Sequence, residues 1–136
     1  MTVARWPGTI PRGSRSQQVS VTMDWTATML ALAGAKSPRS LDGMDLMPAL
    51  SGKTSPVSRT LAWRIAQRRS EGAYRKGDWK FLRNDRGEFL YDLSRDPGEK
   101  TDRRVTDAAR FTELSRAFAS WERGVLAPVG LDSTRR

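Results

Sequence analysis

Residues 71–102 constrain the fold most, because apolar residues alternate there with polar ones in short runs separated by turn residues. A period of two is typical of strands that bury one face. The alternating residues are Trp79, Phe81, Phe89, Tyr91 and Leu93. Lys76-Gly77 suits a tight hairpin, residues 84–87 form a polar turn, and Asp96-Pro97-Gly98 ends the last run. The stretch therefore predicts an antiparallel meander.

A further strand is predicted before this stretch, over residues 61–66. Leu61, Trp63 and Ile65 alternate with less apolar residues and so form one apolar face. Residues 67–72 are polar and predict the turn that follows.

Apolar residues at helical spacing predict a helix over residues 106–122, with Thr106 as its N-cap. The stripe consists of Phe111, Leu114, Phe118 and Trp121. This stripe can lie across the buried face of the sheet. We therefore expect an α+β unit over residues 58–124, a four-stranded antiparallel sheet packed by a C-terminal helix. Residues 125–136 predict a loose tail.

The preceding part, residues 1–57, has a different pattern. It opens with two proline-glycine loops, and such an abrupt start leads us to expect that something upstream is lost or lies on another polypeptide. A helix is predicted over residues 22–33, capped by Ser20 or Thr22, with a stripe formed by Trp25, Met29 and Leu32. A short helix is predicted over residues 45–51, with Pro48 in its first turn.

Composition excludes several kinds of site. The chain of 136 residues has no cysteine and no histidine, so it cannot hold a Ser-His-Asp relay, a cysteine nucleophile or a zinc site of the usual ligands. No apolar run approaches the roughly 18 residues of a membrane helix, and no signal segment is visible. We expect no membrane partner, and the compartment stays unknown.

The formal charge of +9 raises the alternative of a nucleic-acid-binding module. Tyr74 and Arg75 on a four-stranded sheet could form its surface. However, the basic residues are scattered, and the strands follow one another without intervening helices. We therefore favour a solvated basic surface and expect no nucleic-acid partner.

Two groups of residues are candidates for binding. Asp42 and Asp45 flank a glycine, but they lack the further ligands of a calcium loop, so a turn before a helix explains them better. Trp63 and Arg64 offer an aromatic ring and a guanidinium for a planar or anionic ligand. Alternation places these two side chains on opposite faces, and a buried Trp63 with a solvated Arg64 is the simpler interpretation.

Three motifs in series resemble the C-terminal subdomain of sulfatases of the arylsulfatase or N-acetylgalactosamine-6-sulfatase type. They are Gly77-Asp78-Trp79-Lys80, Leu90-Tyr91-Asp92-Leu93 and Asp96-Pro97-Gly98-Glu99. The loop Arg5-Trp6-Pro7-Gly8 and the module at residues 42–52 resemble the family as well. The resemblance runs in the family's order from Arg5 to about Trp121.

The resemblance implies that residues 1–57 are the end of an alkaline-phosphatase-like α/β catalytic domain and that residues 58–124 are the C-terminal subdomain. Full-length relatives hydrolyse sulfuric esters with a formylglycine and a calcium ion, whose residues precede the matched part. Ser55-Pro56 does not fit the nucleophile signature, because its proline and arginine have the wrong offsets. We therefore expect no catalytic and no metal-binding residue in this chain.

The resulting hypothesis is a C-terminal sulfatase fragment that is inactive alone. Its partner would be the missing N-terminal catalytic domain, and a sulfate ester would bind only to the full-length enzyme. Trp63 and Arg64 are the candidates for lining the substrate pocket. A fragment of a related phosphonate or phosphate ester hydrolase is the remaining alternative. Because the helix over residues 22–33 would expose its apolar stripe, we also expect marginal solubility or self-association.

Overall fold

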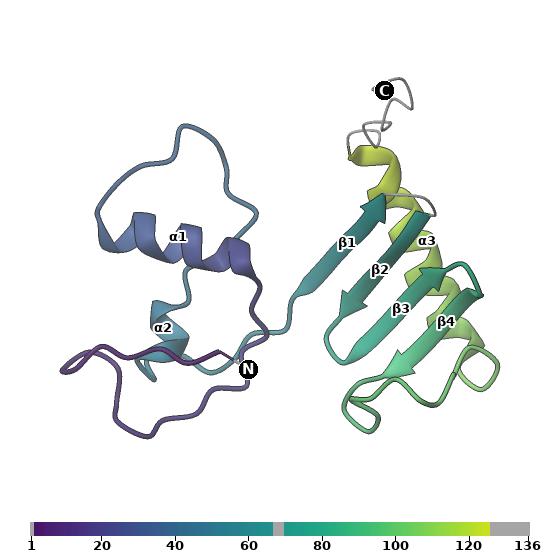
Figure 1. Cartoon of the computed structure of the whole chain (residues 1–136), viewed down its shortest axis with the longest axis horizontal. Coiled ribbons are helices and arrows are strands. Elements are labelled where there is room, and N and C mark those ends of the chain that lie inside the picture. Colours follow the sequence, from purple (N-terminus) through teal and green to yellow (C-terminus); the bar gives the residue numbers. More distant parts are fainter. Residues whose placement is uncertain (1, 67–69, 126–136) are drawn as a thin grey trace, which may run out of the picture. The chain divides into compact units, whose positions relative to one another are not determined.

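The computed structural model describes residues 2–66 and 70–125, and the chain divides into two compact units between Ser58 and Arg59. The N-terminal unit contains helices α1 (Thr22–Leu32) and α2 (Met47–Leu50). The C-terminal unit contains four strands and one helix (Figure 1). Each unit is described by itself below.

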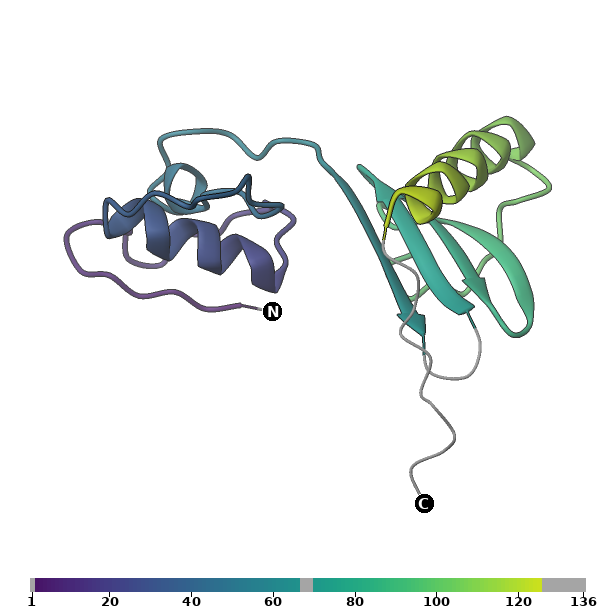
Figure 2. The ribbon, with the colours of Figure 1, turned by 90° about the horizontal axis from the view of Figure 1, so that it is seen from above.

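The C-terminal unit is an antiparallel meander in which strand order follows chain order. Its elements are β1 (Thr60–Ala66), β2 (Ser70–Lys76), β3 (Trp79–Asn84), β4 (Gly87–Asp92) and α3 (Ala108–Gly124). Helix α3 lies across one face of the sheet, as Figure 2 shows. The predicted α+β fold, a four-stranded antiparallel sheet with a C-terminal helix, is confirmed.

Two predicted boundaries in this unit differ from the structure. Strand β2 begins at Ser70, inside the predicted turn of residues 67–72, while residues 67–69 lie outside the described part. Helix α3 begins at Ala108 with Asp107 at the N-cap position, so Thr106 is not the cap; its hydroxyl donates a hydrogen bond to Asp107 Oδ2 instead. The predicted tail over residues 125–136 lies outside the described residues apart from Val125.

The core lies between α3 and the sheet. Phe81, Leu90, Leu114 and Phe118 are almost fully buried there. Four partly buried residues pack against them, namely Tyr74, Trp79, Phe111 and Trp121. A Cβ atom on Gly72 would lie 2.5 Å from Cζ of Phe118, so glycine is required for the helix to approach β2 this closely.

Strand register places some aromatic residues on the face that we did not expect. The turn between β3 and β4 pairs Asn84 with Gly87, which puts Leu90 beside Phe81 in the core. Phe89 and Tyr91 therefore point to the opposite face, because neighbouring residues of a strand alternate. The expectation that every second aromatic residue of residues 71–102 shares one buried face is wrong for β4.

The same correction applies to β1. Ala62 pairs with Tyr74, which pairs with Phe81, so these three residues share the face covered by α3. The apolar face of β1, predicted to be buried under the helix, lies on the other side of the sheet. Trp63 is 39% exposed and Ile65 is 57% exposed.

Polar contacts hold α1 in the N-terminal unit. Asp24 is fully buried; its Oδ2 accepts the N–H of Val21 and its Oδ1 accepts the N–H of Met44. The Thr28 hydroxyl donates to the carbonyl oxygen of Asp24 and accepts the N–H of Leu46. The side chain that accepts a backbone N–H at the start of α1 is thus the carboxylate of Asp24, and not the hydroxyl of Ser20 or Thr22.

Helix α2 is shorter than the predicted residues 45–51, and Pro48 lies in its first turn as expected. Asp45 Oδ1 accepts the N–H of Met47 at the start of this helix. Within the described residues, neither unit contains a helix of the length and apolarity that crossing a membrane requires.

Candidate binding surfaces

The carboxylates of Asp24, Asp45 and Asp96 have local structural roles. Asp45 bonds to α2, and Asp24 bonds to two backbone N–H groups of the N-terminal unit. Asp96 Oδ2 accepts the N–H groups of Lys100 and Thr101, which closes the Asp-Pro-Gly turn. In the parts of the chain that the structure describes, no three acidic, histidine or cysteine residues come together as a metal site.

The two candidate pocket residues lie on opposite faces of β1, as alternation requires. Arg64 pairs with Gly72 and so shares the face of α3, where it is half-buried. Trp63 pairs with Ala73 on the other face and is 39% exposed. The interpretation of Trp63 as a buried residue beside a solvated Arg64 is therefore wrong. One ligand on one face of the sheet can contact Trp63 or Arg64, but not both.

The sheet face opposite α3 is called the open face below. It is formed by Leu61, Trp63, Ile65, Glu71, Ala73, Arg75, Lys80, Leu82, Phe89 and Tyr91. Trp63, Ala73, Leu82 and Phe89 pair in turn and form one row across the four strands. The row is apolar throughout, whereas the rows on either side of it contain Glu71, Arg75 and Lys80.

Lys80 was not among the sequence candidates, yet it lies beside Trp63. Its Nζ is 5.7 Å from the centre of the Trp63 ring and 2.6 Å from Glu99 Oε1. Trp63 and Lys80 approach each other from β1 and β3 over the small Ala73 of β2, which is fully buried. Their contact could have been anticipated from the two-residue alternation of each strand once the strand register was known.

The segment after β4 covers one side of the open face. Glu99 reaches Lys80, and the Arg104 guanidinium lies 5.3 Å from the centre of the Phe89 ring. Tyr91 is buried there; burial raises the pKa of its phenol, and the negative charges of Asp102 and Glu99 raise it further. The β4 side is thus covered by the chain's own residues, whereas the β1 side is exposed.

Tyr74 and Arg75, the proposed surface of a nucleic-acid module, do not act together. Tyr74 packs against the core on the side of α3. Arg75 lies on the open face, where its Nε donates to the carbonyl oxygen of Gly77. The stacking platform that this alternative requires is not formed by these two residues.

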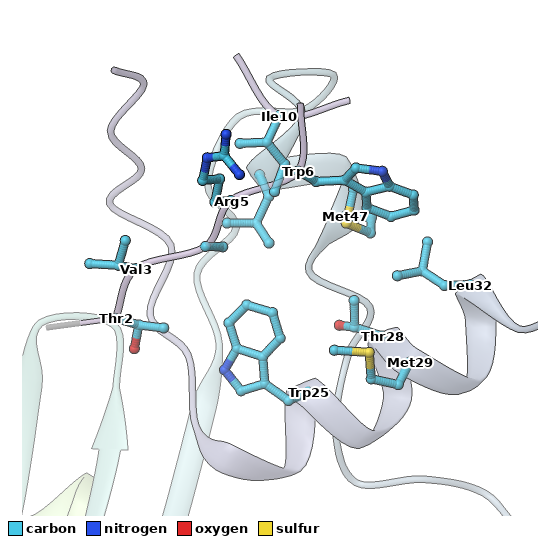
Figure 3. Close-up of a pocket in the computed structure, with 12 residues that line it drawn as sticks. Thr2, Val3, Arg5, Trp6, Ile10, Trp25, Thr28, Met29, Leu32 and Met47 are labelled. Atoms are coloured by element: carbon cyan, nitrogen blue, oxygen red, sulfur yellow. The ribbon is translucent and has the colours of Figure 1, made fainter. Parts of the chain in front are cut away.

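The N-terminal unit has a second apolar surface, a cavity of about 450 Å³ that is called the apolar hollow below. Figure 3 shows Trp25, Met29 and Leu32 of α1 together with Trp6 and Val3 of the N-terminal segment around it. Met29 is 59% exposed and Leu32 is 45% exposed, because α1 packs through Asp24, Ala27 and Thr28 instead. The predicted exposure of the stripe is confirmed for these two residues.

Comparison with known proteins gives the class to which these features point. No family model matches the chain. N-acetylgalactosamine-6-sulfatase of Sus scrofa is 48% identical over 50 residues, which are 35% of this chain and 10% of that protein. The ulvan-active sulfatase of Formosa agariphila is 41% identical over 56 residues, 41% of this chain and 11% of that protein. Human steryl-sulfatase is 43% identical over 54 residues, 38% of this chain and 9% of that protein.

Solved structures extend the likeness to most of the chain. Ps i-CgsB, solved in complex with a neocarrahexaose, has a TM-score of 0.74 and 28% identity over 85% of this chain and 27% of its own. A 2-O GAG sulfatase has a TM-score of 0.51 and 26% identity over 74% of this chain and 23% of its own. The chain therefore matches the C-terminal part of sulfatases, which are sulfuric ester hydrolases.

The resemblance predicted from the motifs is confirmed. The chain spans about a tenth of the length of the curated relatives and about a quarter of the solved neighbours.

Proposed function

We propose that this chain serves as the C-terminal part of a sulfatase and supports an N-terminal catalytic domain. The observation that carries the proposal is the open face, whose apolar β1 side is exposed although the core on the other side of the sheet is complete. An exposed apolar patch of this kind marks an interaction site. The likeness to sulfatases that are several times longer agrees with a domain partner.

Hydrolysis of a sulfate ester needs an activated nucleophile, charge neutralisation on the sulfate oxygens and a proton donor for the leaving group. The described residues offer no cluster of metal ligands, and the sequence has no histidine or cysteine. In this proposal the calcium ion and the formylglycine that the resemblance implies belong to the catalytic domain, and the present chain contributes no chemical step.

In this proposal Trp63, rather than Arg64, lines the substrate pocket. Trp63 is exposed on the open face, and its ring lies beside the ammonium of Lys80, whose charge is paired with that of Glu99. The ion pair with Glu99 holds the Lys80 ammonium in place, so its position is fixed before a ligand arrives. The relatives' names include saccharide and steryl sulfatases, so the proposal extends to sulfuric esters as a class.

Two assays test this function. The purified 136-residue chain should release no phenol from an aryl sulfate, and turnover above a buffer blank would contradict the proposal. The chain should also form a complex when it is co-expressed with the N-terminal remainder of Ps i-CgsB, truncated where the structural match begins.

A matched pair of variants assigns any such complex to the open face. Ile65→Lys should reduce the co-purified fraction, because it places a charge on the exposed β1 side of the open face. Val105→Lys is the control, since Val105 is 84% exposed and precedes α3. Equal recovery of both variants would show that the open face is not the interface.

A further inference from the structure

The two edges of the four-stranded sheet differ. At the β4 edge, the N–H of Leu90 donates to Asp102 Oδ1, and the carbonyl oxygen of Leu90 accepts the N–H of Arg103. The Arg104 guanidinium donates to the carbonyl oxygen of Glu88 on the same edge. The segment after β4 thus covers this edge, whereas no strand of the described residues pairs with the outer edge of β1 (Figure 1). An uncovered edge is a template for pairing with another strand.

Strand β1 lacks the features that commonly block pairing at an edge. Residues 60–66 contain no proline, glycine or lysine, and Arg64 is their one charged residue. The register with β2 is continuous from Thr60 to Ala66, so no bulge bends the strand. Helix α3 makes its main contacts with β2 and β3, and so it does not obstruct a strand beside β1.

The alternation of backbone bonds determines which residues of β1 face outward. The N–H of Gly77 donates to the carbonyl oxygen of Arg59, so the odd-numbered residues of β1 bond to β2. The N–H and C=O groups that point to the outer edge are those of Thr60, Ala62, Arg64 and Ala66. Trp63 is the middle residue of β1, so an antiparallel second copy pairs over the whole strand when Trp63 lies opposite its counterpart.

This register places compatible side chains opposite one another on both faces. On the open face, Trp63 meets its counterpart and Leu61 meets Ile65 of the second copy, and such aromatic and branched pairs stabilise a sheet. Trp63 is 39% exposed and Ile65 57% exposed in the single chain, so both have area to bury. On the face of α3, Arg64 lies opposite Ala62 of the second copy, so no like charges meet.

We propose that two copies of this chain pair through antiparallel β1 strands centred on Trp63 and form one continuous sheet. A twofold axis relates the copies, so the contact is closed and stops at a dimer. A second copy is favoured as the partner because the register that uses all of β1 also separates the two Arg64 side chains. A register centred on Arg64 would set two guanidinium groups opposite each other and shorten the pairing. The inference is independent of the proposed function, because it needs no catalytic domain.

Single cysteine variants test the register, because the chain has no cysteine of its own. Directly opposite residues have Cβ atoms about 4.5 Å apart, close enough for a disulfide. Under mild oxidation, Trp63→Cys should therefore give a linked dimer on a non-reducing gel. Ile65→Cys should give about tenfold less, because its counterpart lies several residues away along the strand. A mixture of Leu61→Cys with Ile65→Cys should restore the link.

Charge at residue 62 tests the pairing without a cross-link. Ala62→Glu sets a carboxylate opposite Arg64 of the second copy and should strengthen the dimer, whereas Ala62→Arg sets like charges there and should weaken it. The dissociation constants from sedimentation equilibrium should differ about tenfold, because each pair occurs twice in the dimer. Met29→Asp, which places a charge in the apolar hollow, is the control and should leave the dissociation constant unchanged.

Several results would overturn the pairing. They are a chain that stays monomeric at its highest soluble concentration, equal cross-linking at residues 63 and 65, and equal dissociation constants for the two Ala62 variants. Association that Met29→Asp abolishes would assign the contact to the apolar hollow instead. Each of these results leaves the co-expression test of the proposed function unaffected, so the two proposals can fail separately.

Discussion

The ammonium of Lys80 lies 5.7 Å from the centre of the Trp63 ring, across the fully buried Ala73. These residues come from β1 and β3, so the contact ties the exposed edge of the sheet to its interior strands. The ring remains 39% exposed, and the open face therefore combines apolar area with the ion pair of Lys80 and Glu99.

This exposed apolar area predicts self-association of the isolated chain. Sedimentation velocity should show species larger than a 15.2 kDa monomer at micromolar concentration. The double variant Trp63→Lys with Ile65→Lys should shift the distribution toward monomer, because like charges then oppose contact between open faces. A single monomeric species for the unmodified chain would contradict this prediction.

Truncation of a core side chain and of an open-face side chain should differ greatly in their effect on the free energy of unfolding. Leu114→Ala removes a fully buried side chain of α3 and should lower the free energy of unfolding by about 2–5 kcal/mol. Ile65→Ala truncates a side chain that is 57% exposed and should cost less than about 1 kcal/mol. Urea denaturation measures both, and similar losses for the two variants would argue against the assignment of the faces.

Removal of the Thr28 hydroxyl should lower the stability of the N-terminal unit. Thr28→Val leaves the N–H of Leu46 without its acceptor in a buried position, which costs about 1–3 kcal/mol. Thr26→Val, on the exposed side of α1, is the matched control and should be nearly neutral. Hydrogen exchange at the amide of Leu46 reports the effect directly, and an unchanged rate in Thr28→Val would rule out this bond.

The lowered pKa values of three carboxyl groups predict that the protein loses stability in acid. The hydrogen bond from Ser94 lowers the pKa of Asp92, that from Arg103 lowers the pKa of Asp107, and that from Lys76 lowers the pKa of Glu113. A pKa lowered by folding stabilises the protein above the unfolded value near about 4, and this contribution disappears as the pH falls through the folded value.

The melting temperature of the C-terminal unit should therefore decrease from pH 6 to pH 3. Asp107→Asn should make this decrease smaller, because the amide cannot be protonated in that range. Stability that rises toward pH 3 would reverse the expected sign.

The sequence predicted the helices and strands well, but it predicted less well which face of each strand is buried. The alternation in residues 61–66 and 71–102 and the apolar stripe with Leu114 and Phe118 were sufficient for four strands and a helix, because local periodicity determines element type. The face of each strand depends on the register, and a shift of one residue at the turn after Asn84 exchanges Phe89 for Leu90 in the core. A single sequence does not contain that register.

The same contrast between local pattern and strand register applies to the candidate site residues. Trp63 was recognised as a residue of interest because its aromatic ring is next in sequence to the Arg64 guanidinium, whereas Lys80 was missed because its contact with Trp63 crosses an intervening strand. The role of Asp24 likewise depends on a contact far away in the sequence. Its bond to Met44 joins residues 20 positions apart, which no local pattern reveals.

The meander with α3 as its last element has a consequence for synthesis. Each strand pairs with the one made just before it, so the sheet has short loops to close and can form while the chain is still leaving the ribosome. Helix α3 emerges after all four strands, so Phe81 and Leu90 have no cover until Leu114 and Phe118 have been translated. A ribosome that stalled before codon 108 would hold a sheet exposed to water on both sides, the species most prone to aggregate during production of this protein.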